Sequence, residues 1–482
     1  MRRLLPLVLL LFAGGCDSRS DAGAVVVSAI GGAPALADPA RGSLTTPDRL
    51  LLDSAAQGLV RFDAAGQIEP GLAERWTVLD DGRSYIFRIR DATWSDGKPV
   101  TAAEVVAILK RQLSPASRNP LRPFLTAIHE IVEMTPEVIE VRLTRPRPDL
   151  LKLFAQPELA IVRARPPGGS GPFRAGAIPQ GGVMLRPAFD PSRADDEDAT
   201  APPPQASVRL IGERAAKAIL HFQHRDSDLV TGGSFADWPL LAQASIPPAT
   251  VRVDPAAGVF GLAIADRTGF LADPGNRAAI AQVIDRDAIV AAFAPGWAAT
   301  LSILPEQLDS AAPPAVPTWQ QAGALNLSPA ERVRQWRQMH PLPLYLRVAV
   351  PAGPGATILY GHVAAALVRI GIVPQRVALA EPADLRLVDA VAPYDSARWY
   401  LAMACQPCGD TAQAALDAAR DAPTLAERAR HIADADAALA ADVAFVPIAR
   451  PLRWSLVSVR LKAWAGNPRA WHPLNRLRTD TN

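Results

Sequence analysis

The chain has 482 residues, with 50 basic and 48 acidic side chains and a formal net charge of +2 at pH 7. This near balance argues against a nucleic-acid-binding protein, which would need a basic stripe or patch. Hydrophobic residues make up 49% of the chain, enough for large cores, and the length allows several domain-sized lobes.

The N-terminus has the layout of a signal peptide: a basic start, an apolar run over 4–12, and small residues leading to Cys16. The run is too short for a stable transmembrane span. The cysteine makes it resemble a bacterial lipoprotein signal, which implies that Cys16 carries lipid and becomes the mature N-terminus. Ala13 stands where such signals usually have leucine, so ordinary signal-peptidase cleavage is the alternative. Asp17 resembles the signal that retains lipoproteins at the inner membrane.

Several elements of the first half follow from local patterns. An apolar run predicts a strand over 25–30, and a helix is expected over 50–59. Two β-prone runs around Asp81-Gly82 predict a hairpin over 76–79 and 85–89. Thr101 and Glu104, placed before an apolar run, form a capping box that predicts a helix start.

The second half alternates between strands and helices. Like charges and prolines over 190–205 predict an exposed, mobile loop. Helical spacing over 276–290 is interrupted at Asp285, which is expected to cap a second helix. Later strand–helix units indicate an α/β lobe, with strands over 344–350 and 443–448 and helices over 356–370 and 424–439.

The order of short motifs resembles the extracytoplasmic solute-binding proteins of peptide-type ABC importers, the oligopeptide- and dipeptide-binding family. The matching segments are Gly58-Leu59, the runs 70–76, 94–105 and 169–174, and Arg277, Ala279, Ile284, Asp285 and Arg286. The resemblance implies an α/β, two-lobed periplasmic binding protein fold of the large three-subdomain type, with a ligand cleft between the lobes.

The same resemblance divides the chain into parts. Residues 1–16 are the lipoprotein signal peptide. The first lobe has a base subdomain from 24–44, 165–250 and 446–482, and an accessory subdomain over 45–164. Residues 251–445 form the second lobe.

The family also implies where the solute binds. Its second lobe carries a tryptophan followed by an acidic run, whose carboxylate pairs with a peptide's ammonium group. Trp399 matches the tryptophan, with a core position as the alternative, but residues 404–409 are Ala, Cys, Gln, Pro, Cys and Gly. Either Asp410 replaces the missing carboxylate or the anchor is lost. Arg398, able to fork onto a carboxylate, and Tyr394 are further candidates.

Cys405 and Cys408 are the other two cysteines. In an oxidising compartment this spacing predicts a local disulfide, with free thiols, or metal or redox chemistry, as the alternatives. Two cysteines lack the four ligands of a structural zinc site. His221 and His224 alone rarely hold a metal, so no metal or other cofactor is expected.

No hydrolase, metalloprotease or phosphate-loop motif is present, so we expect a binding protein and not an enzyme. The expected protein is a monomer tethered by lipid at the periplasmic face of the inner membrane. It would close around a peptide-like solute and deliver it to an ABC permease. The alternative is a peptide-binding chaperone or sensory partner that takes no part in transport. A hydrolase and a metal-chelate importer have less support in the sequence.

Overall fold

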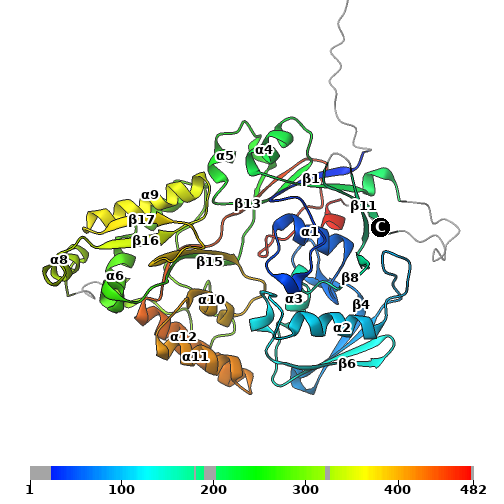
Figure 1. Ribbon diagram of the computed structural model, residues 1–482, viewed down its shortest axis with the longest axis horizontal. Helices are drawn as coiled ribbons and strands as arrows, with labels where there is room; N and C mark the ends of the chain where they lie inside the picture. The colour runs from blue at the N-terminus through cyan, green and yellow to red at the C-terminus, as the bar shows by residue number, and fades with distance from the viewer. Residues whose placement is uncertain (1–22, 179–180, 189–201, 321–325, 479–482) are drawn as a thin grey trace, which may run out of the picture.

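The computed structural model describes residues 23–178, 181–188, 202–320 and 326–478. The predicted signal peptide, Cys16 and most of the acid- and proline-rich segment, 190–201, lie outside the described residues. Two lobes are visible in Figure 1, each built on a mixed sheet, and a third sheet extends the first lobe. The two-lobed α/β fold expected from the sequence is therefore present.

The first lobe is built on a seven-stranded sheet. The predicted strand over 25–30 is its central strand β1, which lies parallel to its neighbours β12 and β13. The strands are, in spatial order, β10 (Phe173–Ala177), β11 (Val183–Pro187), β12 (Val208–Glu213), β1 (Val25–Ile30), β13 (Leu229–Ser234), β20 (Arg453–Val457) and β14 (Val251–Val253). Its helices are α1 (Thr46–Ala55), α4 (Ala215–Gln223) and α5 (Trp238–Ala242).

A four-stranded antiparallel sheet extends this lobe, in the order β4 (Ala73–Leu79), β5 (Ser84–Ile89), β7 (Val138–Leu143) and β6 (Ile128–Thr135). The predicted hairpin is confirmed: β4 and β5 are joined through Asp80, Asp81 and Gly82, all at positive φ. The predicted capping box is also confirmed. Thr101 Oγ1 accepts from the Glu104 amide at 3.3 Å, and the Glu104 side chain accepts from the Thr101 amide, at the start of α2 (Ala102–Leu113).

The limits predicted for the helix over 50–59 were wrong. The helix begins four residues earlier as α1, because Thr45 and Asp48 form a capping box and Pro47 suits the first turn. It also ends earlier, at Ala55, and Gly58 already passes so close to the Phe154 carbonyl that a Cβ would clash. The chain then forms the short pairs β2 (Val60–Phe62) with β3 (Ile68–Pro70) and, after α3 (Leu150–Phe154), β8 (Val162–Ala164) with β9 (Pro167–Gly169).

The second lobe has a five-stranded sheet in the order β17 (Val373–Val377), β16 (Tyr345–Ala349), β18 (Leu385–Val391), β15 (Gly258–Ile264) and β19 (Phe445–Ala449). Its helices are α6 (Pro274–Val283), α7 (Arg286–Ala291), α8 (Pro329–Met339), α9 (Pro354–Arg369), α10 (Ala397–Ala404), α11 (Asp410–Asp421) and α12 (Leu425–Asp442). Asp285 caps α7 as predicted, since its carboxylate accepts from the Ala288 amide at 2.9 Å. In Figure 1, α9 lies on one side of the sheet and α10 to α12 on the other.

The chain crosses between the two large sheets at 254–257 and again at 450–452. Each crossing comes one strand after the expected limit, because β14 still pairs in the first sheet and β19 in the second. The division into subdomains otherwise stays a prediction.

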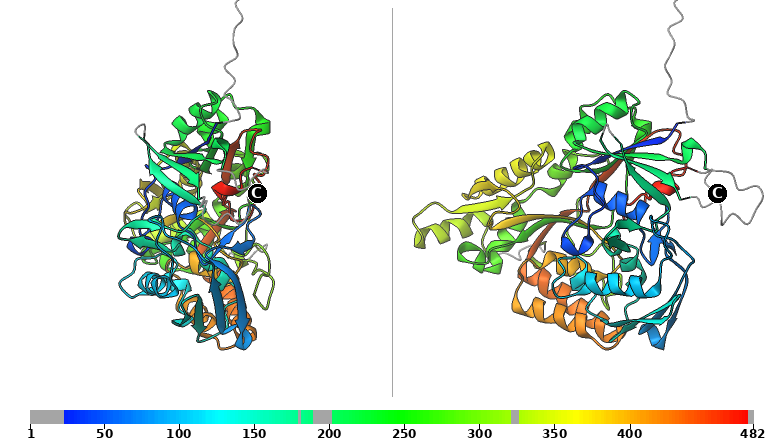
Figure 2. Two further views of the ribbon diagram at one scale, coloured as in Figure 1. Left: turned by 90° about the vertical axis from the view of Figure 1, so that its right-hand side faces the viewer. Right: turned by 45° about the vertical axis from the view of Figure 1, so that its right-hand side comes forward.

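The lobes lie in contact. One cluster of buried apolar residues extends from the four-stranded sheet and α3 of the first lobe into α10, α11 and α12 of the second lobe. Figures 1 and 2 agree that α11 and α12 lie beside the lobe that carries α2. The seam between the lobes is therefore the place to look for a binding site.

Candidate functional site

Among the polar contacts that cross the seam in the described residues, three groups lie around α3, α10 and α11. The side-chain amide of Gln156 donates to the Pro393 carbonyl at 2.8 Å. Asp395, in the loop before α10, pairs with Lys152 of α3 and with Arg469 of the C-terminal segment. Arg145 pairs with Asp421 at the end of α11, at 3.2 Å. These contacts hold the two lobes in a closed arrangement.

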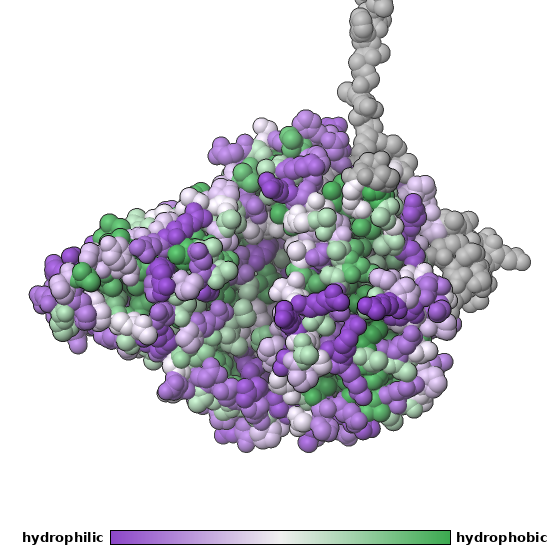
Figure 3. All heavy atoms as spheres, in the orientation of Figure 1, coloured by the Kyte–Doolittle hydropathy of each residue, from purple (hydrophilic) through white to green (hydrophobic). Residues whose placement is uncertain are grey.

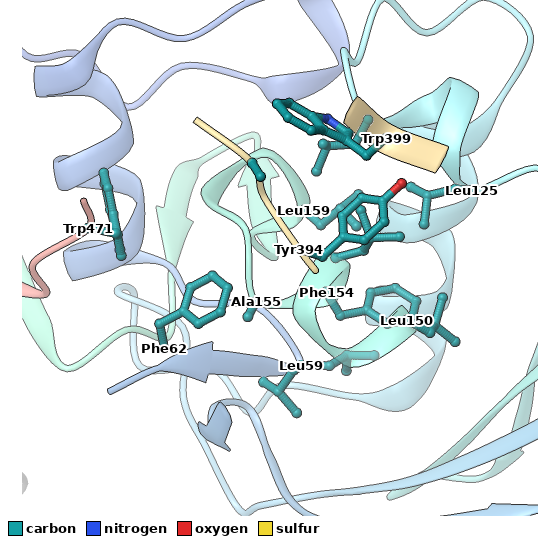
Figure 4. Packing of buried hydrophobic residues seen from close by; sticks show 14 of the residues in the cluster. Leu59, Phe62, Leu125, Leu150, Phe154, Ala155, Leu159, Tyr394, Trp399 and Trp471 are labelled. Carbon is teal, nitrogen blue, oxygen red and sulfur yellow. The ribbon is translucent and has the colours of Figure 1, made fainter. Parts of the chain in front are cut away.

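A cavity of about 270 Å³, which we name the tryptophan cavity, lies inside this seam. The second lobe contributes the loop after β18 and two side chains one helical turn apart on α10, Trp399 and Met403. Opposite them are Phe62 of β2 and Trp471, as Figure 4 shows. The complete lining is Arg49, Phe62, Pro120, Leu121, Phe124, Gln156, Glu158, Val391, Ala392, Pro393, Trp399, Met403, Arg469 and Trp471. Figure 3 shows a furrow between the lobes on one face.

The charged groups of the tryptophan cavity are already paired. Arg49 lies 2.8 Å from a Glu158 oxygen and stacks 4.7 Å from the centre of the Trp471 ring. Arg469 donates to the Ala392 carbonyl at 2.9 Å and pairs with Asp395. The cavity therefore offers an aromatic and apolar surface with satisfied charges at its edges.

The start of α10 is fixed by a carboxylate from another segment. Asp309 accepts hydrogen bonds from the Ser396 hydroxyl at 2.9 Å and from the Ala397 amide at 2.6 Å. Arg428 of α12 also donates to Asp309, at 2.9 Å. Because Asp309 satisfies an amide of the first turn, it holds the helix that presents Trp399.

A second cavity, of about 360 Å³, lies against a neighbouring face of α10, and we name it the arginine cavity. Arg398 and Ala402 contribute from α10, while Pro123 and Thr126 contribute from the first lobe. The lining also includes Cys405, Gln413, Leu416, Asp417 and Arg420. Burial, together with the nearby cations Arg147 and Arg428, lowers the pKa of Arg398 to about 10.

The other two residues predicted to contact the solute, Tyr394 and Asp410, line neither cavity. Tyr394 is 1% exposed, borders neither cavity, and packs its ring edge-on against Phe124 with 6.1 Å between centroids. Burial raises the pKa of its hydroxyl. Asp410 is exposed as the first residue of α11 and borders neither cavity. Cys405 and Cys408 are joined in a disulfide between the end of α10 and the start of α11.

Sequence reasoning missed much of the cavity wall. Arg49, Phe62, Arg469 and Trp471 come from segments far apart in the chain, and no local pattern connects them. For Trp471 the residue type was itself a signal, since aromatic side chains often line ligand pockets.

No group of three or more His, Cys, Asp or Glu side chains within the described ranges is arranged to hold a metal ion. No helix in the same ranges is both long and apolar enough to cross a membrane.

The sequence profile of the bacterial extracellular solute-binding proteins, family 5, matches residues 67–327. Probable deoxycholate-binding periplasmic protein YgiS of Escherichia coli is 38% identical over 97 residues, which is 20% of this chain and 18% of that protein. The matched segment thus spans less than a fifth of this curated relative.

Solved structures match over almost the whole chain. Haemophilus influenzae OppA in complex with the peptide RPPGFSPFR has a TM-score of 0.77 at 17% identity, covering 94% of this chain and 98% of that one. The binding protein AgaA of A. tumefaciens R10 in complex with agropinic acid has a TM-score of 0.71 at 20% identity, covering 95% and 98%. At these identities the structures show a shared fold.

Proposed function

The chain belongs to the bacterial extracellular solute-binding proteins of family 5, and on this basis we propose that it captures a small solute between its lobes for an ABC permease. Proteins of this family are binding proteins and not enzymes. The observation that carries the proposal is the tryptophan cavity, whose walls come from both lobes. A solute held there contacts both lobes at once and so favours the closed arrangement over the open one.

The size of the cavities argues for a small solute. Their volumes of about 270 and 360 Å³ lie just below and just above the lower limit of the usual range for ligand pockets. Similar proteins are named for peptides, agropinic acid and deoxycholate, so the fold accommodates solutes of different chemistry. We expect a solute of about dipeptide size, with an apolar part against Trp399.

The four residues predicted to contact the solute have different roles in this proposal. Trp399 is a wall of the tryptophan cavity and Arg398 a wall of the arginine cavity. Tyr394 lines neither cavity and supports the segment that lies between the two cavities. Asp410 would contact a solute only in another arrangement of the lobes, since it borders neither cavity here.

We further propose that Cys16 anchors the protein by lipid at the periplasmic face of the inner membrane. The support is the leader sequence alone, with its small residues before the cysteine. In a cell fractionation, the wild-type protein is expected with the membranes and the Cys16→Ser variant in the soluble periplasmic fraction or as uncleaved precursor. A wild-type protein found entirely in the soluble fraction would favour ordinary signal-peptidase cleavage.

Isothermal titration of residues 17–482 with short peptides, opines, bile acids and sugars tests the binding function. Any solute that binds is then titrated into Met403→Ala, which removes apolar wall from the tryptophan cavity, and we expect affinity to fall about tenfold. Met339→Ala is the matched control, because Met339 is 73% exposed at the end of α8. Equal affinities of the two variants would place the solute elsewhere.

Transport is tested separately from binding. Deleting the gene should abolish uptake of the radiolabelled solute, and expressing the wild-type protein should restore it. Normal uptake without the protein would favour the role of a chaperone or sensory partner.

A further inference from the structure

Arg398 is a buried cation whose carboxylate partner is absent. Its residue is 7% exposed, and the one hydrogen bond of its guanidinium to a described residue runs from Nε to the Leu416 carbonyl, at 3.4 Å. No acidic side chain in the described ranges forms an ion pair with it. Its charged neighbours are mostly further cations, Arg147, Arg420 and Arg428, and the nearby carboxylate of Asp421 is already paired with Arg145 and Arg420.

Two other buried arginines of the second lobe have more backbone partners than Arg398, although Nη2 of Arg286 is left without one. Arg286 donates to the carbonyls of Pro447, Ala281 and Ile284 at 2.7–3.0 Å. Arg450 donates to the Ile303 carbonyl at 2.7 Å and to the Gly258 carbonyl at 3.2 Å. Neither of these arginines borders the tryptophan or the arginine cavity, whereas Arg398 does. Of these three arginines, Arg398 has the fewest partners in the fold and is the one beside a space that a solute can fill.

Each acidic side chain that lines the two cavities is paired with an arginine. Glu158 is paired with Arg49 at 2.8 Å. Asp417 is paired with Arg420 at 2.7 Å. Glu158 Oε2 has no hydrogen-bond partner, but the charge of each of these two carboxylates is matched by an arginine, whereas Arg398 has no ion-pair partner among the described residues.

We propose that the solute is a small anion whose carboxylate pairs with Arg398 in the arginine cavity, and that its recognition requires no ammonium group. This inference rests on the proposed binding function and names the class of its ligand. A peptide-like solute would then be held by its carboxyl end, and a non-peptide carboxylic acid would serve equally well.

The physical argument is that an isolated buried charge is unfavourable until it is paired. The planar guanidinium can donate two parallel hydrogen bonds to one carboxylate, and such charge-assisted bonds are stronger than neutral ones. The protein without solute bears the cost of burying Arg398, and the bound anion removes it. The binding site therefore lowers the stability of the unliganded protein.

Matched probes test the charge requirement. N-acetyl-alanyl-alanine carries a carboxylate and no ammonium, whereas alanyl-alaninamide carries an ammonium and no carboxylate, at similar size. Acetate, compared with chloride at equal ionic strength, serves as the minimal probe of the anion subsite. We expect acetate and the acetylated dipeptide to raise the melting temperature and the amide to leave it unchanged.

Substitution of the guanidinium gives the second readout. Arg398→Gln should lower affinity for the acetylated dipeptide at least about tenfold, and Arg398→Lys should lower it less. The unliganded Arg398→Gln protein should melt at the same or a higher temperature, because an unpaired buried charge is removed. Arg334→Gln on the exposed surface of α8 is the matched control for the loss of one arginine.

The outcomes separate this inference from the proposed function. A lower melting temperature of unliganded Arg398→Gln, with affinity unchanged, would make Arg398 structural and overturn the inference. Binding of the amide but not of the acetylated dipeptide would also overturn it, while leaving the binding function intact. Failure of every probe, acetate and free alanyl-alanine included, would count against both.

Discussion

The Gln156 side chain lies across the seam and donates a 2.8 Å hydrogen bond to the carbonyl oxygen of Pro393, in the wall of the tryptophan cavity. The same amide nitrogen lies 3.2 Å from the Lys152 carbonyl, so it is held by its own lobe while it reaches the other. A solute in the cavity and this hydrogen bond therefore favour the same closed arrangement.

Replacing Gln156 by alanine should shift the protein toward an open form. The loss of this cross-lobe bond is worth about 1 kcal/mol, enough to change a closed population several-fold. Small-angle scattering should show a larger radius of gyration for Gln156→Ala without solute. Gln112→Ala is the control, since Gln112 makes the same kind of bond, to Ala160, within one lobe. Equal scattering of Gln156→Ala and wild type would contradict the role of this contact.

The ion pairs of Asp395 should stabilise the closed arrangement of the lobes except at low pH. Burial alone would raise its pKa, but the hydrogen bond from Lys152 and the charge of Arg469 lower it below its ordinary value of 3.8. A carboxyl with a lowered pKa stabilises the closed form above its ordinary pKa, and this contribution is lost as the pH falls below about 4. Scattering should therefore report the same closed form from pH 5 to 8. Asp395→Asn should weaken closure over this whole range.

The contribution of Asp149 to stability should depend on pH with the opposite sign. Burial, and next the Asp309 carboxylate, raise the pKa of this residue at the start of α3 to about 6. The folded protein then keeps a proton that the unfolded chain releases near pH 4, so stability falls as the pH rises from about 4 to 6. Asp149→Asn should stabilise the protein at pH 7.5 by about 1–3 kcal/mol in urea unfolding and have little effect at pH 4. Asp81→Asn, in an exposed turn, is the control.

Reducing the disulfide should cost little stability. Cys405 and Cys408 enclose a very short loop, so their bond restricts the unfolded chain only modestly, by about 2 kcal/mol. Thermal unfolding with and without dithiothreitol measures the difference. The Cys405→Ser, Cys408→Ser double variant should show no response to the reductant. A loss of much more than this would mean that the disulfide holds α10 against α11 in the folded state.

Local signals in the sequence predicted much of the fold. Thr101 with Glu104, and Asp285, each satisfy an amide within the next three residues, so their effect needs no knowledge of the rest of the chain. The limits of α1 were missed although Thr45 and Asp48 carry the same kind of signal. Its end was also missed, because the close approach of Gly58 to Phe154 is a contact between distant segments.

The site was predictable only in part. Trp399 and Arg398 lie in a segment that resembles a family motif, and both border cavities at the seam. The pairing of Arg469 with Asp395 depends on how the lobes meet, and that of Arg49 with Glu158 on the packing of two distant segments of the first lobe. Whether a charge in this seam is free or neutralised is a property of the tertiary structure, and the sequence does not state it.

A thermal-shift screen of the protein without its signal peptide tests the central claim most directly, provided that wild type, Met403→Ala and Arg398→Gln are screened side by side. We predict a small carboxylic acid that raises the melting temperature of wild type strongly and that of Arg398→Gln much less, while Met403→Ala reports whether the tryptophan cavity is also filled. A solute that shifts all three proteins equally would bind outside the seam and contradict the account.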